Sequence, residues 1–322
     1  MIVRLAIAYL TALAPAPAAV PIGDGVHFIQ GGFGAGRQPD GNSVVFEAPD
    51  GLIVVDSGRH AEHQRKILAL AAARRMPIAA LVNTHWHLDH SGGNAELREA
   101  AGGELSIHAS RAVEGALTGF LARSKAEAVA FLASGKADAA TAAEIEGDIA
   151  AVDERRSLLP TAPVDGPGER RIAGRPLSLR LAQHAATAGD VWVYDAASGI
   201  VAVGDLVTLP VPFFDTACPE GWRRALTEIA GTPFTRLVPG HGAVMGRPEF
   251  MVWKRAFERL HDCAGSSRGD GACIAGWQSD AAALLAPDEG RQADAMLGYY
   301  LKTRLRGKPG ERVRYCPGGA DG

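Results

Sequence analysis

The segment that decides the fold is Thr84-His85-Trp86-His87-Leu88-Asp89-His90-Ser91-Gly92-Gly93, which places three histidines and one carboxylate within six positions. Protonated imidazoles this close would repel one another, so a metal cation is the natural partner for the cluster. In an extended segment the side chains alternate between two faces, so His85 and His87 point the same way and can hold one ion. Asp89 and His90 follow in a turn and can diverge toward a second ion.

The residues on either side of this segment indicate an α/β fold. Residues 78–83 form a short apolar run that predicts a buried strand, and residues 95–100 have the pattern of a helix start. The ligand cluster therefore lies on a loop at the C-terminal end of a strand, which is a usual place for an α/β active site. Ser91-Gly92-Gly93 lets the backbone turn sharply into the helix.

The segment resembles the signature of the metallo-β-lactamase fold superfamily, whose members bind one or two metals, most often zinc, between two β-sheets. The resemblance implies an α/β protein built as a four-layer αββα sandwich. It also implies that His85 and His87 hold the first metal, and that Asp89 and His90 hold the second.

Further motifs follow in the order of this family between Val26 and Gly242. Asp205 closes an apolar strand, and the resemblance makes it the carboxylate that bridges the two metals. A Pro-Gly-His loop ends the next motif, and the resemblance makes His241 a ligand of the second ion. Asp56 ends an earlier strand, where the resemblance implies a residue that supports the metal loop; its alternative role is to cap the following helix.

One position departs from the family pattern. The remaining histidine of the family usually stands immediately before a Thr-x-Gly-Asp segment, but here Ala186 precedes Thr187-Ala-Gly-Asp190. His184 lies two residues earlier, and two residues of extended loop keep a side chain on the same face. We therefore expect His184 to be the third ligand of the first metal. The alternative is that this ligand is missing and that two histidines and Asp205 bind the first metal weakly.

The first 19 residues have the layout of a secretory signal peptide. Arg4 precedes an apolar run of ten residues, Leu5–Ala14, and small residues follow that fit a cleavage site. A membrane-spanning helix needs about 20 apolar residues, so a periplasmic or secreted protein without an integral membrane segment is expected. The net charge of −3 and the scattering of arginines among acids argue against nucleic-acid binding, so the expected partner is a small-molecule substrate.

The chain contains four cysteines, and an even number in an exported protein favours disulfides. Cys263 and Cys273 flank a turn-rich segment, so we expect them to pair with each other. Cys218 and Cys316 would then form the second bond and tie the C-terminal tail to the loop after Asp205.

Two parts of the chain are expected after signal cleavage. Residues 20–250 would form the metallo-β-lactamase-like domain, and residues 251–322 a helical C-terminal extension. Within the domain, residues 111–160 predict two helices around Gly135. In the resembled family such insertions often roof the active site, and a helical hairpin packed for stability is the alternative. The glycine-rich residues 31–36 predict a hairpin loop near the metal site rather than a dinucleotide site, because no helix follows them.

The expected chemistry is hydrolysis by a metal-bound hydroxide, which two zinc ions would generate near neutral pH. Asp89 would orient this hydroxide and move its proton. The predicted function is an exported metal-dependent hydrolase acting on an ester, thioester, lactone or related bond. No strand-to-helix G-x-S-x-G nucleophile elbow that would supply a rival serine is predicted. Iron is also possible as the metal, because related enzymes use a single iron on the same ligands to oxidise persulfides.

Two alternatives stay open. The first is a non-catalytic, metal-binding accessory factor of a periplasmic oxidation system. The departure from the family pattern, with Ala186 in place of histidine, supports this alternative. The second is a β-lactamase, although true β-lactamases of this fold tend to lack the bridging carboxylate that Asp205 would provide. The stretch Gly204–Asp215, with Gly221-Trp222, also resembles a subgroup called quinoprotein relay system zinc metallohydrolases, exported proteins found near periplasmic quinoprotein systems.

Overall fold

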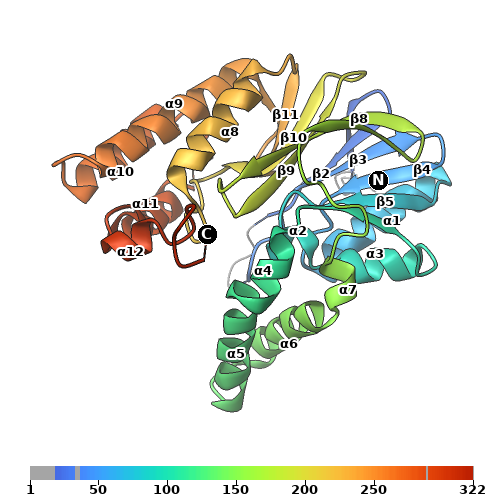
Figure 1. Ribbon diagram of the computed structural model, residues 1–322, viewed down its shortest axis with the longest axis horizontal. Coiled ribbons are helices and arrows are strands. Elements are labelled where there is room, and N and C mark those ends of the chain that lie inside the picture. Colours follow the sequence, from blue (N-terminus) through green and yellow to red (C-terminus); the bar gives the residue numbers. More distant parts are fainter. Residues whose placement is uncertain (1–18, 33–36, 288, 322) are drawn as a thin grey trace, which may run out of the picture.

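The structure is a computed structural model that describes residues 19–32, 37–287 and 289–321. The predicted signal peptide lies outside the described residues, apart from Ala19. Two β-sheets face each other, and helices cover the outer face of each sheet (Figure 1). Three hydrophobic cores separate the resulting four layers. This arrangement confirms the predicted αββα fold.

The first sheet is built from the N-terminal part of the described chain. Its strands lie in sequence order, antiparallel from β1 to β4 and then parallel from β4 to β6. All five residues of β4 are buried, as is typical of a strand covered on both faces. The strands are β1 (Val20–Gly23), β2 (Val26–Ile29), β3 (Ser43–Ala48), β4 (Gly51–Val55), β5 (Ile78–Val82) and β6 (Ser106–His108).

The second sheet has the order β12-β11-β10-β9-β8-β7. Its strands pair antiparallel except for β10 and β11, which run parallel. Every residue of β10 is buried between the inner core and the outer helices. The strands are β7 (Gly168–Ile172), β8 (Arg175–Gln183), β9 (Gly189–Asp195), β10 (Ile200–Thr208), β11 (Arg236–His241) and β12 (Met245–Gly246).

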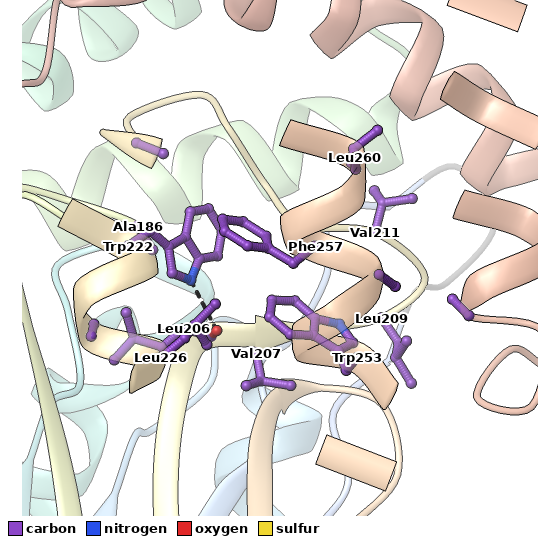
Figure 2. Packing of buried hydrophobic residues seen from close by; sticks show 14 of the residues in the cluster. Ala186, Leu206, Val207, Leu209, Val211, Trp222, Leu226, Trp253, Phe257 and Leu260 are labelled. Carbon is purple, nitrogen blue, oxygen red and sulfur yellow. Dashed lines mark hydrogen bonds between the residues drawn. The ribbon is translucent and has the colours of Figure 1, made fainter. Parts of the chain in front are cut away.

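Helices cover the outer face of each sheet through apolar side chains. On the first sheet, α1 (Ala61–Arg74) and α3 (Asn94–Ala100) share a core with β4 and β5. On the second, α8 (Pro219–Gly231) and α9 (Arg247–Ala264) pack against β10 around Trp222, Trp253 and Phe257 (Figure 2). Burying side chains of this size contributes about 1.5–3 kcal/mol each.

The C-terminal residues form the predicted helical extension. Its elements are α10 (Asp270–Asp280), α11 (Glu289–Tyr300), η1 (Leu301–Leu305) and α12 (Pro309–Arg312). Trp277 and Leu297 belong to the same apolar core as Trp253 of α9, so the extension thickens the helical layer on the second sheet.

The predicted helical insertion projects from the sandwich beside the first sheet (Figure 1). Its elements are α4 (Ala112–Thr118), α5 (Phe120–Ala133), α6 (Ala139–Asp153) and α7 (Arg155–Leu158). Gly135 has a φ of +68° in the turn between α5 and α6. Asp148 of α6 accepts a hydrogen bond from Arg59 Nη1 at 2.6 Å, and Glu144 Oε1 accepts one from the Gln38 amide at 2.7 Å. These bonds fasten the hairpin to the loops that lead into the candidate site.

Both predicted disulfides are confirmed. Cys263 pairs with Cys273 across ten residues, and Cys218 pairs with Cys316 across 98 residues.

Among the described residues, no helix combines the length and the apolar character needed to cross a membrane.

Candidate metal centre

The ends of strands from both sheets bring the candidate ligands together. His85 and His87 lie in the loop that follows β5, and α2 (Leu88–Ser91), a single helical turn, carries Asp89 and His90. The second sheet contributes the other two candidates. Asp205 lies within β10 and His241 is the last residue of β11.

Six of these side chains form two groups, each able to hold a metal ion. The first group is His85, His87 and Asp205, and the second is Asp89, His90 and His241; the ligand atoms within each group lie within 4.8 Å of one another. The structure therefore gathers six of the seven predicted metal ligands. Among the described residues, a third group that includes Cys218 and Cys316 is ruled out as a thiolate site because those two cysteines form a disulfide.

Asp205 lies between the two groups. Its Oδ2 faces the first group, 3.6 Å from His85 Nε2. Its Oδ1 faces the second group, 3.0 Å from His90 Nε2 and 3.6 Å from His241 Nε2. One carboxylate can thus offer a separate oxygen to each of two ions.

Burial and mutual charge perturb the ionisable groups of the cluster. Burial holds the pKa of His85 well below its usual value, and the neighbouring ring of His90 lowers it further. Burial also opposes charge on His90, but the carboxylates of Asp205, Asp56 and Asp89 outweigh it and raise the pKa of His90 well above its usual value. The cluster thus combines anionic carboxylates with at least one imidazole that remains neutral.

The residues present fit a metal ion. His85 Nε2 is buried and has no hydrogen-bond partner among the described residues, although it faces Asp205. Buried polar atoms are almost always satisfied, so a ring nitrogen that faces a carboxylate without a hydrogen-bond partner fits a site for a cation. Imidazole nitrogens with carboxylate oxygens are a donor set that suits zinc and iron.

Asp56 holds the loop of residues 84–90 in place through hydrogen bonds. Its Oδ2 accepts hydrogen bonds from Thr84 Oγ1 at 2.7 Å and from His90 Nδ1 at 2.7 Å, and its Oδ1 accepts one from the Thr84 amide at 2.8 Å. A proton on Nδ1 leaves the Nε2 lone pair of His90 directed at the second group. The alternative role as a helix cap is wrong, because α1 begins at Ala61 with His60 as its N-cap residue.

Replacing Asp56 with asparagine should weaken metal binding about 10- to 100-fold, because the amide cannot accept all three hydrogen bonds. Asp56 has a φ of +61°, a conformation that asparagine also tolerates, so the exchange adds no backbone strain. Metal affinity can be measured by competition with a chelator. Asp50→Asn, at an exposed position beside the same strand, is the matched control. An affinity equal to that of the control would contradict the supporting role.

Glycine allows the hairpin loop between β2 and β3 to approach the metal groups. A Cβ atom on Gly41 would lie 2.4 Å from Cε1 of His90, and the Gly41 amide donates to the Asp89 carbonyl at 2.8 Å. A larger residue here would displace the histidine ring. The loop that begins with the glycine-rich residues 31–36 therefore ends against the metal centre, as predicted, although residues 33–36 themselves lie outside the described chain.

The structure does not bring His184 to either group. Its Nδ1 lies 3.3 Å from the carbonyl oxygen of Tyr315, and its ring lines a hollow at the surface. The expectation assumed an extended loop, but His184 has a φ of +51° and its amide donates to the Ala188 carbonyl in a tight turn. This left-handed residue breaks the alternation of side chains, so the same-face argument fails. The geometry matches the alternative in which the first group has two histidines and Asp205.

Three further side chains, which no sequence pattern marks, border the two groups. Thr216 Oγ1 lies 3.0 Å from His87 Nε2. The partly exposed rings of Phe120 and Phe213 flank the groups, with centroids 6.4 Å from His87 and 5.2 Å from His241 respectively. None of the three is a usual ligand type in a recognisable spacing, so no local signal marks them.

Comparisons with solved structures agree with the fold described above. A metallo-beta-lactamase from Pontibacter korlensis superposes with a TM-score of 0.53 at 19% identity, covering 72% of this chain and 94% of the other. The DIM-1 metallo-beta-lactamase superposes with a TM-score of 0.53 at 14% identity, covering 74% of this chain and 96% of the other. These similarities concern the fold alone.

Two sequence comparisons add to the structural ones. A linear primary-alkylsulfatase from a Pseudomonas species is 39% identical over 69 residues, which is 20% of this chain and 13% of the relative. The chain thus matches only a small part of that relative's length. The sequence model of the metallo-beta-lactamase superfamily matches residues 36–241, which include both candidate metal groups. The chain therefore belongs to the metallo-beta-lactamase superfamily.

Proposed function

We propose that this protein is an exported, metal-dependent hydrolase that cleaves an ester, thioester, lactone or related bond. The observation that carries the proposal is the position of Asp205, whose two oxygens face two separate groups of imidazole and carboxylate ligands. Bound divalent metals would supply an activated water and polarise the bond to be cleaved. Zinc is the expected metal, since these donors suit it.

Asp89 is the residue we propose for moving the proton. Burial raises the pKa of the Asp89 carboxyl, but the charges of His90 and His241 outweigh burial and hold the pKa well below its usual value. The carboxylate is therefore ionised at neutral pH. Its Oδ2 lies 3.0 Å from His241 Nε2, within the second group. In this position the carboxylate can accept a proton from water.

The aromatic residues at the edge of the site support a substrate with an apolar part. Phe120 begins the helix α5 of the insertion, and Phe213 follows β10, so the two rings approach the metal groups from different parts of the chain. Partly exposed aromatic rings beside polar catalytic groups are typical of small-molecule sites. The helical insertion thereby contributes to the substrate side of the site in this proposal.

Export is proposed from two observations. The described chain forms two disulfides and leaves no free cysteine, as is usual for proteins of oxidising compartments. The predicted signal peptide in residues 1–19 agrees with this compartment.

A panel of substrates tests the function. Zinc-loaded protein should hydrolyse at least one aryl ester, thioester or lactone, lose this activity on chelation and regain it when metal is returned. Asp89→Asn should lower kcat about 10²- to 10⁴-fold, while the exposed control Asp50→Asn should not change it. Metal content is measured in parallel, so that loss of an ion is distinguished from loss of the proton acceptor.

Two further substrate classes belong in the panel. A primary alkyl sulfate is included because of the similarity to the alkylsulfatase, which makes sulfate-ester hydrolysis the second candidate function. A β-lactam is included because the fold is shared with β-lactamases. Metal-loaded protein that cleaves none of these bonds would contradict the hydrolase proposal and favour the accessory role.

A further inference from the structure

The two metal groups of this chain are not equivalent. Each contains two histidines and shares Asp205, but the second group also has the carboxylate of Asp89. The first group has no third histidine, because Ala186 stands at the family position and His184 is turned toward Tyr315. Two histidines and Asp205 give the first group three protein ligands, one fewer than the second group, and leave a coordination position that a further oxygen donor can take.

Thr216 is the side chain beside this gap. Its hydroxyl lies 3.0 Å from Nε2 of His87 and 3.1 Å from the carbonyl oxygen of Ala186. A hydroxyl has one proton and two lone pairs. Because the Ala186 carbonyl can only accept, the proton of Thr216 is directed there, and a lone pair faces His87 Nε2. Whatever His87 carries on that nitrogen, a proton or a metal ion, therefore meets an oxygen lone pair.

The separation of these two atoms suits neighbouring ligands of one ion. Zinc binds nitrogen and oxygen at about 2.0–2.2 Å, so two adjacent ligand atoms lie roughly 3–3.5 Å apart. The distance of 3.0 Å between Thr216 Oγ1 and His87 Nε2 falls in this range.

The position of Thr216 is fixed by its surroundings. The side chain is 1% exposed, and the next residue but one, Cys218, forms the disulfide with Cys316. The Cys218 amide also donates to the Ala185 carbonyl at 2.8 Å. The loop is thus held against the segment of Ala185 and Ala186, and the hydroxyl is held in place before any ion binds.

We infer that the hydroxyl of Thr216 is the additional ligand of the first metal, in place of the missing histidine. The inference rests on the proposed function only in requiring that the chain binds metal. Both groups use two imidazoles and Asp205. The remaining ligand is the charged carboxylate of Asp89 in the second group and the neutral hydroxyl of Thr216 in the first. A neutral oxygen attracts a divalent cation less than a carboxylate does. The first position therefore binds metal more weakly than the second, so the second position fills before the first.

Stepwise metal titration of the chelator-treated full-length protein tests this inference, with cobalt(II) as a coloured substitute for zinc. The wild type should bind two equivalents, the second at least tenfold more weakly than the first. Thr216→Val keeps the shape and removes the lone pairs, so it should weaken the second step about tenfold or more and leave the first step unchanged. Thr216→Ser keeps the hydroxyl and should bind both equivalents as the wild type does.

A cysteine variant gives a spectroscopic signal that a purely structural role of Thr216 would not produce. Thr216→Cys places a thiolate where the hydroxyl was, and a thiolate on cobalt(II) produces a charge-transfer absorption band in the near ultraviolet. This band should appear when cobalt fills the first position and should be absent from the wild type. The first binding step of each variant reports whether the rest of the site has folded.

The outcomes separate this inference from the proposed function. An unchanged second step in Thr216→Val, or no charge-transfer band in a Thr216→Cys protein that binds two equivalents, would overturn the role of Thr216 and leave the hydrolase proposal intact. If Thr216→Val does not fold, the comparison of Thr216→Cys with the wild type decides. A wild type that binds no metal would contradict both.

Discussion

Replacing Asp205 with alanine is expected to remove metal from both positions, with a fall from about two ions per chain to near zero and a loss of at least about a thousandfold in kcat/KM. The reason is that its two oxygens face the two groups, at 3.0 Å from His90 Nε2 and 3.6 Å from His85 Nε2. Without them, each group loses its shared negative charge. Elemental analysis of purified protein measures the metal, and a far-ultraviolet spectrum verifies the fold.

The matched control is Asp190→Asn. Asp190 is a buried carboxylate on the adjacent strand β9, and burial raises its pKa to about 7. It is therefore partly neutral at pH 7, and its oxygens accept hydrogen bonds from the amide and hydroxyl of Thr187. The asparagine variant should retain its metal. An Asp205→Ala protein that keeps either ion at wild-type occupancy would show that Asp205 does not hold both.

Truncation of Trp222 to alanine is expected to lower the free energy of unfolding by about 4 kcal/mol or more. The side chain is fully buried between α8 and α9, with its ring 5.0 Å from that of Phe257 (Figure 2). Its Nε1 donates a hydrogen bond of 2.9 Å to the carbonyl of Leu206, the residue after the proposed bridging carboxylate. The variant leaves both a large cavity and an unsatisfied carbonyl in β10.

Denaturant unfolding with the disulfides intact measures this loss. Trp222→Phe is the control, because it refills most of the cavity and forfeits mainly the hydrogen bond, which costs about 1–3 kcal/mol. If alanine and phenylalanine cost the same, the cavity is not the main cause. A loss below about 1.5 kcal/mol for the alanine variant would show that the helical layer relaxes into the space.

Features coded over short stretches of sequence were predictable. The four ligand-type residues from His85 to His90 lie in one loop, so their spacing alone indicated a shared cation. The apolar runs that predicted a strand at residues 78–83 and another ending at Asp205 are likewise local, as is the turn around Gly135, although the second strand continues to Thr208. The pairing of Cys263 with Cys273 was suggested by the turn between them, and it determined the second pair by elimination.

Features that depend on backbone conformation or distant contacts were not predictable. The expectation for His184 failed because a single residue with a φ of +51° turns the chain. Positive φ is uncommon at any residue other than glycine, so even histidine, which is enriched there, seldom adopts it. Thr216 meets His87 across 129 positions of sequence. A threonine belongs to no metal-binding spacing, so only the fold reveals that contact. Asp56 was compatible with two roles until its bonds to Thr84 and His90 were visible.

The disulfide between Cys218 and Cys316 can form only late in the synthesis of the chain. Its second half is synthesised 98 residues after its first, whereas His85, Asp205 and His241 all precede Cys316. Domains begin to fold from the N-terminal side as the chain is made. The sandwich can therefore close before the loop of Thr216 is clamped, and that loop is the last part of the centre to acquire its covalent restraint.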